Sequence, residues 1–174
     1  MGVSAVVKDA RKAVLKAVGV QPQEAEQDLL DTLKAEHDEV KGLLEDLQNA
    51  DTAPQRNALV QQIRQALIPH TKAEEKVLYA AITALKDKDA QVDGHEGYIE
   101  HDLAAKTLQK LAAIANAKSS EHKAAAKVLK ELIEHHIQEE ERNVWGDARK
   151  YFSDEDRIAM NRRYRAAQAR VKVS

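Results

Sequence analysis

Apolar residues recur three and four positions apart along most of this chain, which is the spacing of helices that bury one face. No stretch of useful length alternates apolar and polar residues as a strand would. Breaks in the pattern divide it into six predicted helices, over about residues 3–18, 24–49, 54–85, 93–116, 119–149 and 154–172. Short connections make the four long helices antiparallel neighbours. We therefore expect an all-α fold, an antiparallel up-down-up-down four-helix bundle with short flanking N- and C-terminal helices.

The same breaks predict how the chain is divided. Residues 1–22 are expected to form an N-terminal flanking helix, residues 23–150 the bundle, and residues 151–174 a basic C-terminal helix. A polar loop is expected over residues 86–94. The apolar face of the N-terminal helix has no large aromatic side chain, so packing against the bundle is expected rather than binding to a membrane surface. Packing against a second subunit, which would make a homo-oligomer through the flanking helices, remains open.

Each long helix carries a histidine inside its own apolar stripe. In the first helix the stripe runs through Leu33, His37 and Val40, and the other three helices repeat this arrangement. The second and fourth helices add a glutamate one turn after the histidine. The six polar residues of the stripes are His37, His70, Glu74, His101, His136 and Glu140. Helical periodicity therefore predicts that all six face the bundle interior.

The six residues are also predicted to lie at one height. In an antiparallel pair, two residues at the same level lie equally far from the connection between their helices. The midpoints of His37 and His70, of Glu74 and His101, and of His101 and His136 all fall in predicted connections. We therefore expect the six side chains to converge on one layer.

Such a layer predicts metal ions. A buried carboxylate costs several kcal/mol unless it is paired, protonated or bound to a metal. Histidine and carboxylate donors without thiolate suit iron, and manganese or zinc fit the same donors. Six protein ligands shared by two metal ions leave open coordination positions, where a small molecule can bind.

The composition narrows the chemistry further. The chain has no cysteine, which excludes disulfides and thiolate ligands and fits a cytoplasmic location. Its net charge is -2, so no nucleic-acid partner is expected. No apolar run approaches the roughly 20 residues of a transmembrane segment, so none is expected. None of the seven histidines follows a glutamate by three residues, which argues against a ferritin-like di-iron protein.

Four segments around the stripe residues resemble one known family. They are KAEHDEVKGLL, IPHTKAEEKVLY, YIEHDLAAKTL and EHHIQEEERNVW. With the order H…HxxxE…H…HxxxE, the sequence resembles the hemerythrin-like family with the HHE cation-binding domain. The resemblance implies a four-helix bundle with two non-haem iron ions that bind dioxygen or a related small molecule. It also implies that the six stripe residues are the metal ligands, with Glu74 and Glu140 as bridges.

The sequence departs from the oxygen-carrying members in one respect. Those proteins have a fifth histidine four residues from the third-helix ligand, and the corresponding positions here are Gly97 and Ala105. Tyr98 and His135 are expected to be outer neighbours of the site or substitute ligands. Glutamates beside the ligands, such as Glu141, are interpreted as facing solvent or as further outer neighbours.

Three classes of function remain open. The favoured one is a non-haem di-iron protein that binds or senses dioxygen, nitric oxide or peroxide. The second is iron homeostasis or protection against oxidative stress. The third is a di-iron enzyme with oxidase- or peroxidase-like activity. No catalytic residue is predicted beyond the metal ligands, because no Ser-His-Asp arrangement and no glycine-rich phosphate loop is found.

Overall fold

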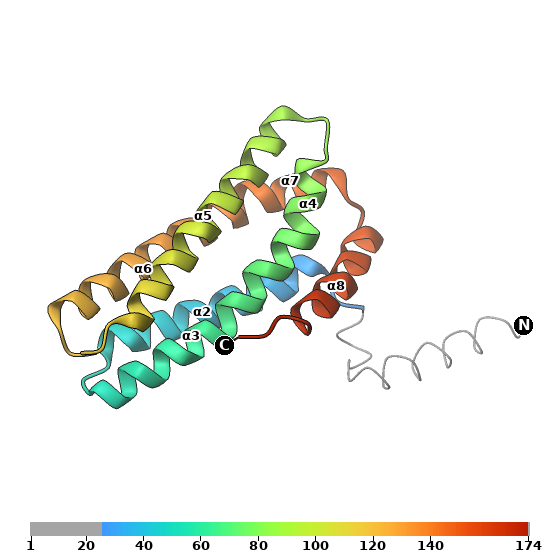
Figure 1. Ribbon diagram of the computed structural model, residues 1–174. Coiled ribbons are helices and arrows are strands. Elements are labelled where there is room, and N and C mark those ends of the chain that lie inside the picture. Colours follow the sequence, from blue (N-terminus) through green and yellow to red (C-terminus); the bar gives the residue numbers. More distant parts are fainter. Residues whose placement is uncertain (1–25, 174) are drawn as a thin grey trace, which may run out of the picture.

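The computed structural model describes residues 26–173, and all of the regular secondary structure in that range is helical. The bundle is built from α2 (Leu29–Asn49), α3 (Ala53–Glu74), α5 (Lys88–Ala113) and α6 (Ser120–Glu139) (Figure 1). Each of these helices contacts two of the others, in the cyclic order α2, α3, α5, α6. The predicted all-α bundle is confirmed. The predicted N-terminal helix lies outside the described residues.

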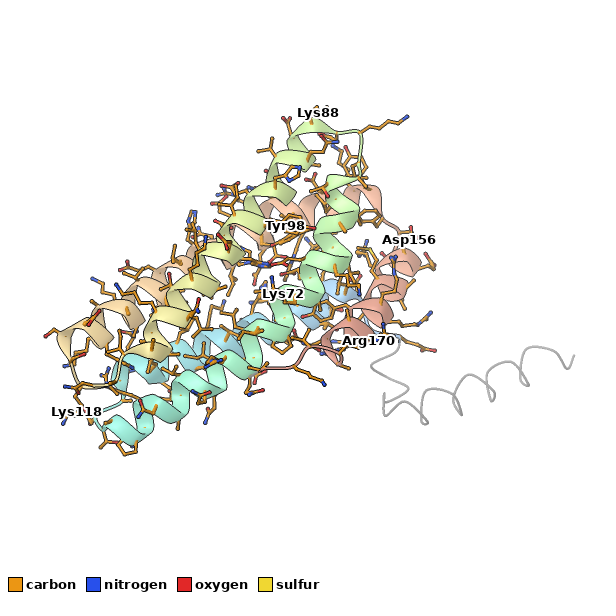
Figure 2. The ribbon with its side chains drawn as sticks, in the orientation of Figure 1. Lys72, Lys88, Tyr98, Lys118, Asp156 and Arg170 are labelled. Atoms are coloured by element: carbon orange, nitrogen blue, oxygen red, sulfur yellow. The ribbon has the colours of Figure 1, made fainter. Side chains whose placement is uncertain are left out.

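Side-chain caps set the ends of the helices. Thr52 forms a capping box with Gln55 at the start of α3, and the Ser119 hydroxyl accepts from a backbone N–H in the first turn of α6. The Asp87 carboxylate accepts from the backbone of Asp89 and Ala90 and starts α5 at Lys88. The loop predicted over residues 86–94 is therefore wrong from residue 88 onward. Lys88 and Lys118 lie at opposite ends of the bundle (Figure 2).

Two apolar clusters fill the bundle, one on each side of the polar layer. The cluster near the N-terminus of α2 includes Leu29, Leu33, Ala73, Leu78, Tyr79, Ile82, Val144, Trp145, Met160 and Tyr164. The cluster toward the other end includes Val40, Leu44, Leu47, Ile63, Leu67, Leu108, Leu111, Leu129 and Ile133. The layer of histidines and glutamates is thus closed off from water along the bundle axis by packed side chains.

A π-helical turn interrupts the second and the fourth helical segments at equivalent places. In the second segment η2 (Glu75–Tyr79) follows Glu74 and leads into α4 (Ala80–Thr83). In the fourth, η3 (Glu140–Val144) begins at Glu140 and leads into α7 (Trp145–Tyr151). Single π-turns inside α-helices often mark functional sites. Here both turns adjoin the glutamate of an HxxxE motif.

The last helix, α8 (Asp154–Gln168), packs across α2, α3 and η2 (Figure 1). Its Ser153 cap forms a capping box with Asp156, and Arg157 binds Asp28 with a distance of 2.7 Å between Nε and Oδ2. The C-terminal helix therefore covers one side of the bundle. Within residues 26–173 no helix is long and apolar enough to span a membrane.

Candidate metal centre

The six residues from the apolar stripes meet in one buried layer. Each is at most 4% exposed: His37, His70, Glu74, His101, His136 and Glu140. Their donor atoms form two overlapping groups. His37, His70 and Glu74 place one donor atom each within 4.8 Å of the others, and Glu74, His101 and His136 do the same. Glu74 belongs to both groups, as a residue shared by two metal ions would.

Both carboxylates connect the two helical hairpins. Glu74 Oε2 lies 3.4 Å from His70 Nε2 and 3.5 Å from His101 Nε2. Glu140 Oε2 lies 3.4 Å from His37 Nε2 and 3.5 Å from His136 Nε2. Each glutamate thus contacts one imidazole from the α2–α3 hairpin and one from the α5–α6 hairpin.

Four further glutamates contact the outward Nδ1 atoms of these histidines. The Nδ1-to-carboxylate distances are 3.0 Å for His37–Glu141, 3.0 Å for His70–Glu36, 3.4 Å for His101–Glu75 and 2.8 Å for His136–Glu100. Every outer glutamate is a sequence neighbour of one stripe residue but contacts a different one. Glu36, for example, precedes His37 and binds His70. This crossed pairing depends on which helices are neighbours in space, which the periodicity of a single helix does not specify.

Hydrogen bonds to outer glutamates fix how the imidazoles of His37, His70 and His136 face the interior, whereas His101 Nδ1 has only the longer contact with Glu75 among the described residues. When Nδ1 donates its proton to a carboxylate, Nε2 keeps its lone pair, and this is the form that binds a metal ion. His101 Nε2 and His136 Nε2 lie 3.1 Å apart, but several other inward atoms lack hydrogen-bond partners in the described part of the chain. Both Glu74 oxygens, Glu140 Oε2 and His37 Nε2 are buried without a hydrogen bond among the described residues. Buried polar atoms are rarely left so, and a bound cation would satisfy them.

The charges in the layer are strongly coupled. Burial opposes ionisation of Glu74, but the charge on His70 and the close contact with His101 hold its pKa well below the usual range. Burial, and then the negative charge of Glu74, raise the pKa of Glu140. Burial lowers the pKa of His70, but Glu74 and Glu36 outweigh it and raise the pKa to about 10. Two carboxylates at one level repel each other and need positive charge between them.

An aromatic residue follows each HxxxE motif and contacts the layer. Trp145 donates from Nε1 to Glu140 Oε1 at 3.2 Å and stacks on His37 with ring centroids 5.5 Å apart. Tyr79 lies 5.1 Å from the ring of His101, and its buried hydroxyl has no hydrogen-bond partner among the described residues. The Tyr79 ring occupies the space that a side chain at position 97 would need, so this position of the ring requires Gly97.

A Cβ atom on Gly97 would lie 2.5 Å from Tyr79 Cζ and 2.7 Å from the hydroxyl oxygen. At Gly97, one of the two positions that correspond to the missing fifth histidine, the space for a side chain is thus filled by Tyr79. The sequence signal for Tyr79 was its place five residues after Glu74, which Trp145 repeats after Glu140.

Tyr98 and His135, the other two candidates from the sequence, lie farther out. The Tyr98 hydroxyl donates to the carbonyl oxygen of Glu75 at 2.7 Å (Figure 2). The His135 side chain is 63% exposed and lies 3.6 Å from Glu100. Both therefore contact a residue that holds a histidine of the layer.

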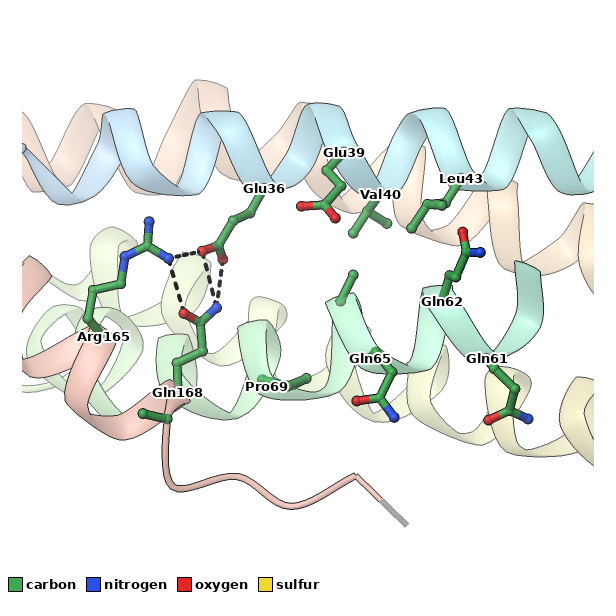
Figure 3. A pocket seen from close by; sticks show the side chains of 12 residues that line it. Glu36, Glu39, Val40, Leu43, Gln61, Gln62, Gln65, Pro69, Arg165 and Gln168 are labelled. Atoms are coloured by element: carbon green, nitrogen blue, oxygen red, sulfur yellow. Dashed lines mark hydrogen bonds and ion pairs between the residues drawn. The ribbon is translucent and has the colours of Figure 1, made fainter. Parts of the chain in front are cut away.

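Helix α8 reaches the layer through Glu36. Arg165 and Gln168 donate to the Glu36 carboxylate at 2.6 Å and 3.1 Å (Figure 3). The buried Tyr164 hydroxyl also donates to Glu36 and lies 3.0 Å from His70 Nδ1. A groove of about 760 Å³ runs between α2, α3 and the end of α8, and Glu36 forms part of its wall. The groove lies beside the metal layer and does not enter it.

Four antiparallel helical segments with an inward layer of histidine and glutamate define a class of protein, the helical bundles that hold metal ions with nitrogen and oxygen donors. The chain belongs to the hemerythrin family: the model described as hemerythrin HHE cation binding domain matches residues 28–146. It is therefore a metal-binding protein of the di-iron type in its fold and donor set.

Among curated proteins, the chain is similar to one named DNA nickase from Nostoc sp. (strain PCC 7120 / SAG 25.82 / UTEX 2576). The two are 26% identical over 175 residues, which cover 98% of this chain and 49% of the relative. The chain thus spans about half the length of this relative. No solved structure matches it significantly.

Proposed function

We propose that this protein holds two non-haem iron ions and binds or senses dioxygen, nitric oxide or peroxide. The observation that carries the proposal is the position of Glu74 and Glu140. Each carboxylate lies between imidazoles of both hairpins, and both have buried oxygens without partners among residues 26–173. When bound, the iron pair would supply open coordination positions and one-electron redox chemistry.

The protein residues would have separate tasks in this centre. The six stripe residues would hold the metal ions, with Glu74 and Glu140 as bridges. The four outer glutamates would orient the imidazoles and make them better donors. The apolar clusters on both sides would exclude water, which strengthens every charge interaction inside the layer. Manganese and zinc suit the same donors, so the identity of the metal belongs to the proposal.

Metal content and spectra test the proposal together. Protein produced with added iron should contain about two iron ions per chain, as the ligand set proposes, and should show charge-transfer bands of an oxo-bridged pair. The reduced protein should then form a stable new band when oxygen is admitted. Fully folded protein without metal after loading would contradict the proposal. Rapid irreversible oxidation would favour oxidase- or peroxidase-like chemistry or stress protection, and weak, exchangeable iron would favour iron homeostasis.

A second candidate function is metal-dependent cleavage of DNA. It is suggested by the curated relative named DNA nickase, whose match covers 98% of this chain and 49% of the relative. The net charge of -2 does not favour binding to nucleic acid. Incubation of metal-loaded protein with supercoiled plasmid tests it. Conversion to open circles that requires the metal and Glu74 would support nicking, and intact plasmid would contradict it.

Two further expectations from the sequence stay predictions. One is the division of the chain into residues 1–22, 23–150 and 151–174, and the other is a homo-oligomer.

A further inference from the structure

A narrow cleft joins the surface to the metal layer beside Gly97. Its volume is about 10 Å³, roughly the space of one water-sized sphere. The lining runs from exposed side chains at the mouth to buried ones at the floor: Glu96, Asp93, Asn143, Glu139, Glu100, Gly97, Val144, His136, Glu140 and Tyr79. The cleft therefore ends at Glu140 and His136, two of the proposed ligands.

The lining is strongly acidic. Four of its outer residues are Asp93, Glu96, Glu100 and Glu139, and none of the described lining residues is a lysine or an arginine. Arg142 pairs with Glu139, whereas no hydrogen bond or ion pair to Asp93 or Glu96 is found among residues 26–173. Burial and the charges of nearby carboxylates, Asp147 first and then Glu96, raise the pKa of Asp93. A cluster of four carboxylates in which Asp93 and Glu96 have no cationic partner among the described residues attracts cations and repels anions.

Two buried groups point to a ligand at the floor of the cleft. Tyr79 and Glu140 both line it, and the Tyr79 hydroxyl and Glu140 Oε2 lack hydrogen-bond partners among the described residues. A side chain at position 97 would collide with Tyr79, so glycine allows the Tyr79 ring to lie in this wall of the cleft. The two apolar clusters cover the layer along the bundle axis, and α8 covers it near His70.

We propose that the cleft at Gly97 is the passage through which divalent cations reach the metal layer, and that Asp93 and Glu96 steer them to its mouth. The proposal rests on the metal centre proposed above and adds where that centre is loaded. Asp93 and Glu96 contact none of the six proposed ligands in the described structure, so they would act on the rate of loading and leave the final occupancy unchanged.

The rate of Co²⁺ loading tests the passage, because Co²⁺ stays divalent in air and develops visible bands when it is bound. The double variant Asp93→Asn/Glu96→Gln should load about tenfold more slowly at low salt, within the usual range of electrostatic steering. Its final Co²⁺ content should equal that of the natural protein. The difference should shrink near 1 M salt, where the screening length is about 3 Å. Glu96→Lys, at an exposed position, should slow loading similarly and avoids any change at half-buried Asp93.

The matched control is Asp102→Asn/Glu131→Gln, which also removes two negative charges, from exposed positions on α5 and α6 that do not line the cleft. It should load at the natural rate. Equal rates for the natural protein, both cleft variants and the control would overturn the passage while leaving the metal centre intact. Absence of bound Co²⁺ in the natural protein at equilibrium would overturn the centre, and the passage with it.

Discussion

The two hairpins of the bundle provide matching halves of one layer of histidines and glutamates, but their surroundings differ. In the α2–α3 half, His70 Nδ1 contacts Glu36 and the Tyr164 hydroxyl, and α8 holds Glu36 with Arg165 and Gln168. In the α5–α6 half, His136 Nδ1 contacts Glu100, which the exposed His135 approaches from solvent. The acidic cleft also opens on this side. The two hairpins thus supply equivalent donor atoms, and they differ in the side chains that pack around the outer glutamate of each half. We expect this packing to determine how firmly each histidine is held.

Among the changes that test how the two halves differ, removal of an inward carboxylate should have the largest effect, a loss of bound metal from both halves. Glu74→Ala and Glu140→Ala each delete a group that contacts an imidazole of both halves, so either should reduce the metal content from about two ions per chain to one or fewer. Metal analysis of purified, iron-loaded protein measures this. Glu131→Ala, on the surface of α6, is the control and should keep both ions. Unchanged metal content in both the Glu74 and the Glu140 variant would contradict the proposal that these residues bridge the two metal ions.

Exchange of an outer carboxylate should have the next largest effect. Glu36→Gln and Glu100→Gln each weaken the hydrogen bond to one imidazole, which typically lowers metal affinity by about 10- to 100-fold. We expect Glu36→Gln to be the more severe, because it also disturbs Tyr164, Arg165 and Gln168. Competition with a chelator gives the affinities. Equal losses would mean that α8 does not make the first half different from the second.

Substitution of Gly97 tests how closely the cleft wall is packed, and Gly42 serves as the control. Gly97→Ala forces Cβ against the Tyr79 ring and should destabilise the protein by about 1–3 kcal/mol. Gly42 is an exposed position of α2, and nothing lies within 4 Å of the atom that alanine would add. Gly42→Ala should therefore stabilise the protein by about 0.5–1 kcal/mol. Urea unfolding of metal-free protein measures both. A neutral Gly97→Ala would show that Tyr79 moves freely.

Loss of single hydroxyls should have the smallest effect. Tyr164→Phe removes a buried donor to Glu36 and should cost about 1–2 kcal/mol of unfolding free energy. Tyr98→Phe removes the half-buried donor to the Glu75 carbonyl and should cost about 0.5–1 kcal/mol. The same urea experiment decides the order. The reverse order would mean that contacts of α8 contribute less than those within the bundle.

Much of the fold could be predicted from the sequence, because it depends on spacing along single helices. The steps of three and four placed His37 and His70 in buried stripes, and equal distances from the connections placed them at one height. The start of α5 was missed because a single carboxylate, Asp87, caps a stretch whose polar composition favours a loop.

The outer contacts of the site could not be predicted in the same way. Glu36 and Glu100 precede histidines in the sequence, but each binds a histidine on the neighbouring helix. Tyr164 is more than 90 residues from His70 and meets it only because α8 folds back on the bundle. Such pairings depend on the packing of whole helices, which local periodicity does not encode.

The two π-turns have a consequence for how this sequence can change in evolution. A π-turn holds one residue more than an α-turn, so it acts as a one-residue insertion that the helix absorbs without breaking. Leu78 within η2 and Ile82 after it are fully buried, each one residue later than Val77 and Ala81, to which the stripe through Glu74 extrapolates; Ala81 is only half-buried, although Val77 is also buried. Deletion of one residue within η2 would therefore turn every later side chain of that segment by about 100°. Relatives of this chain should gain or lose residues in the interhelical connections and keep the length of both turns.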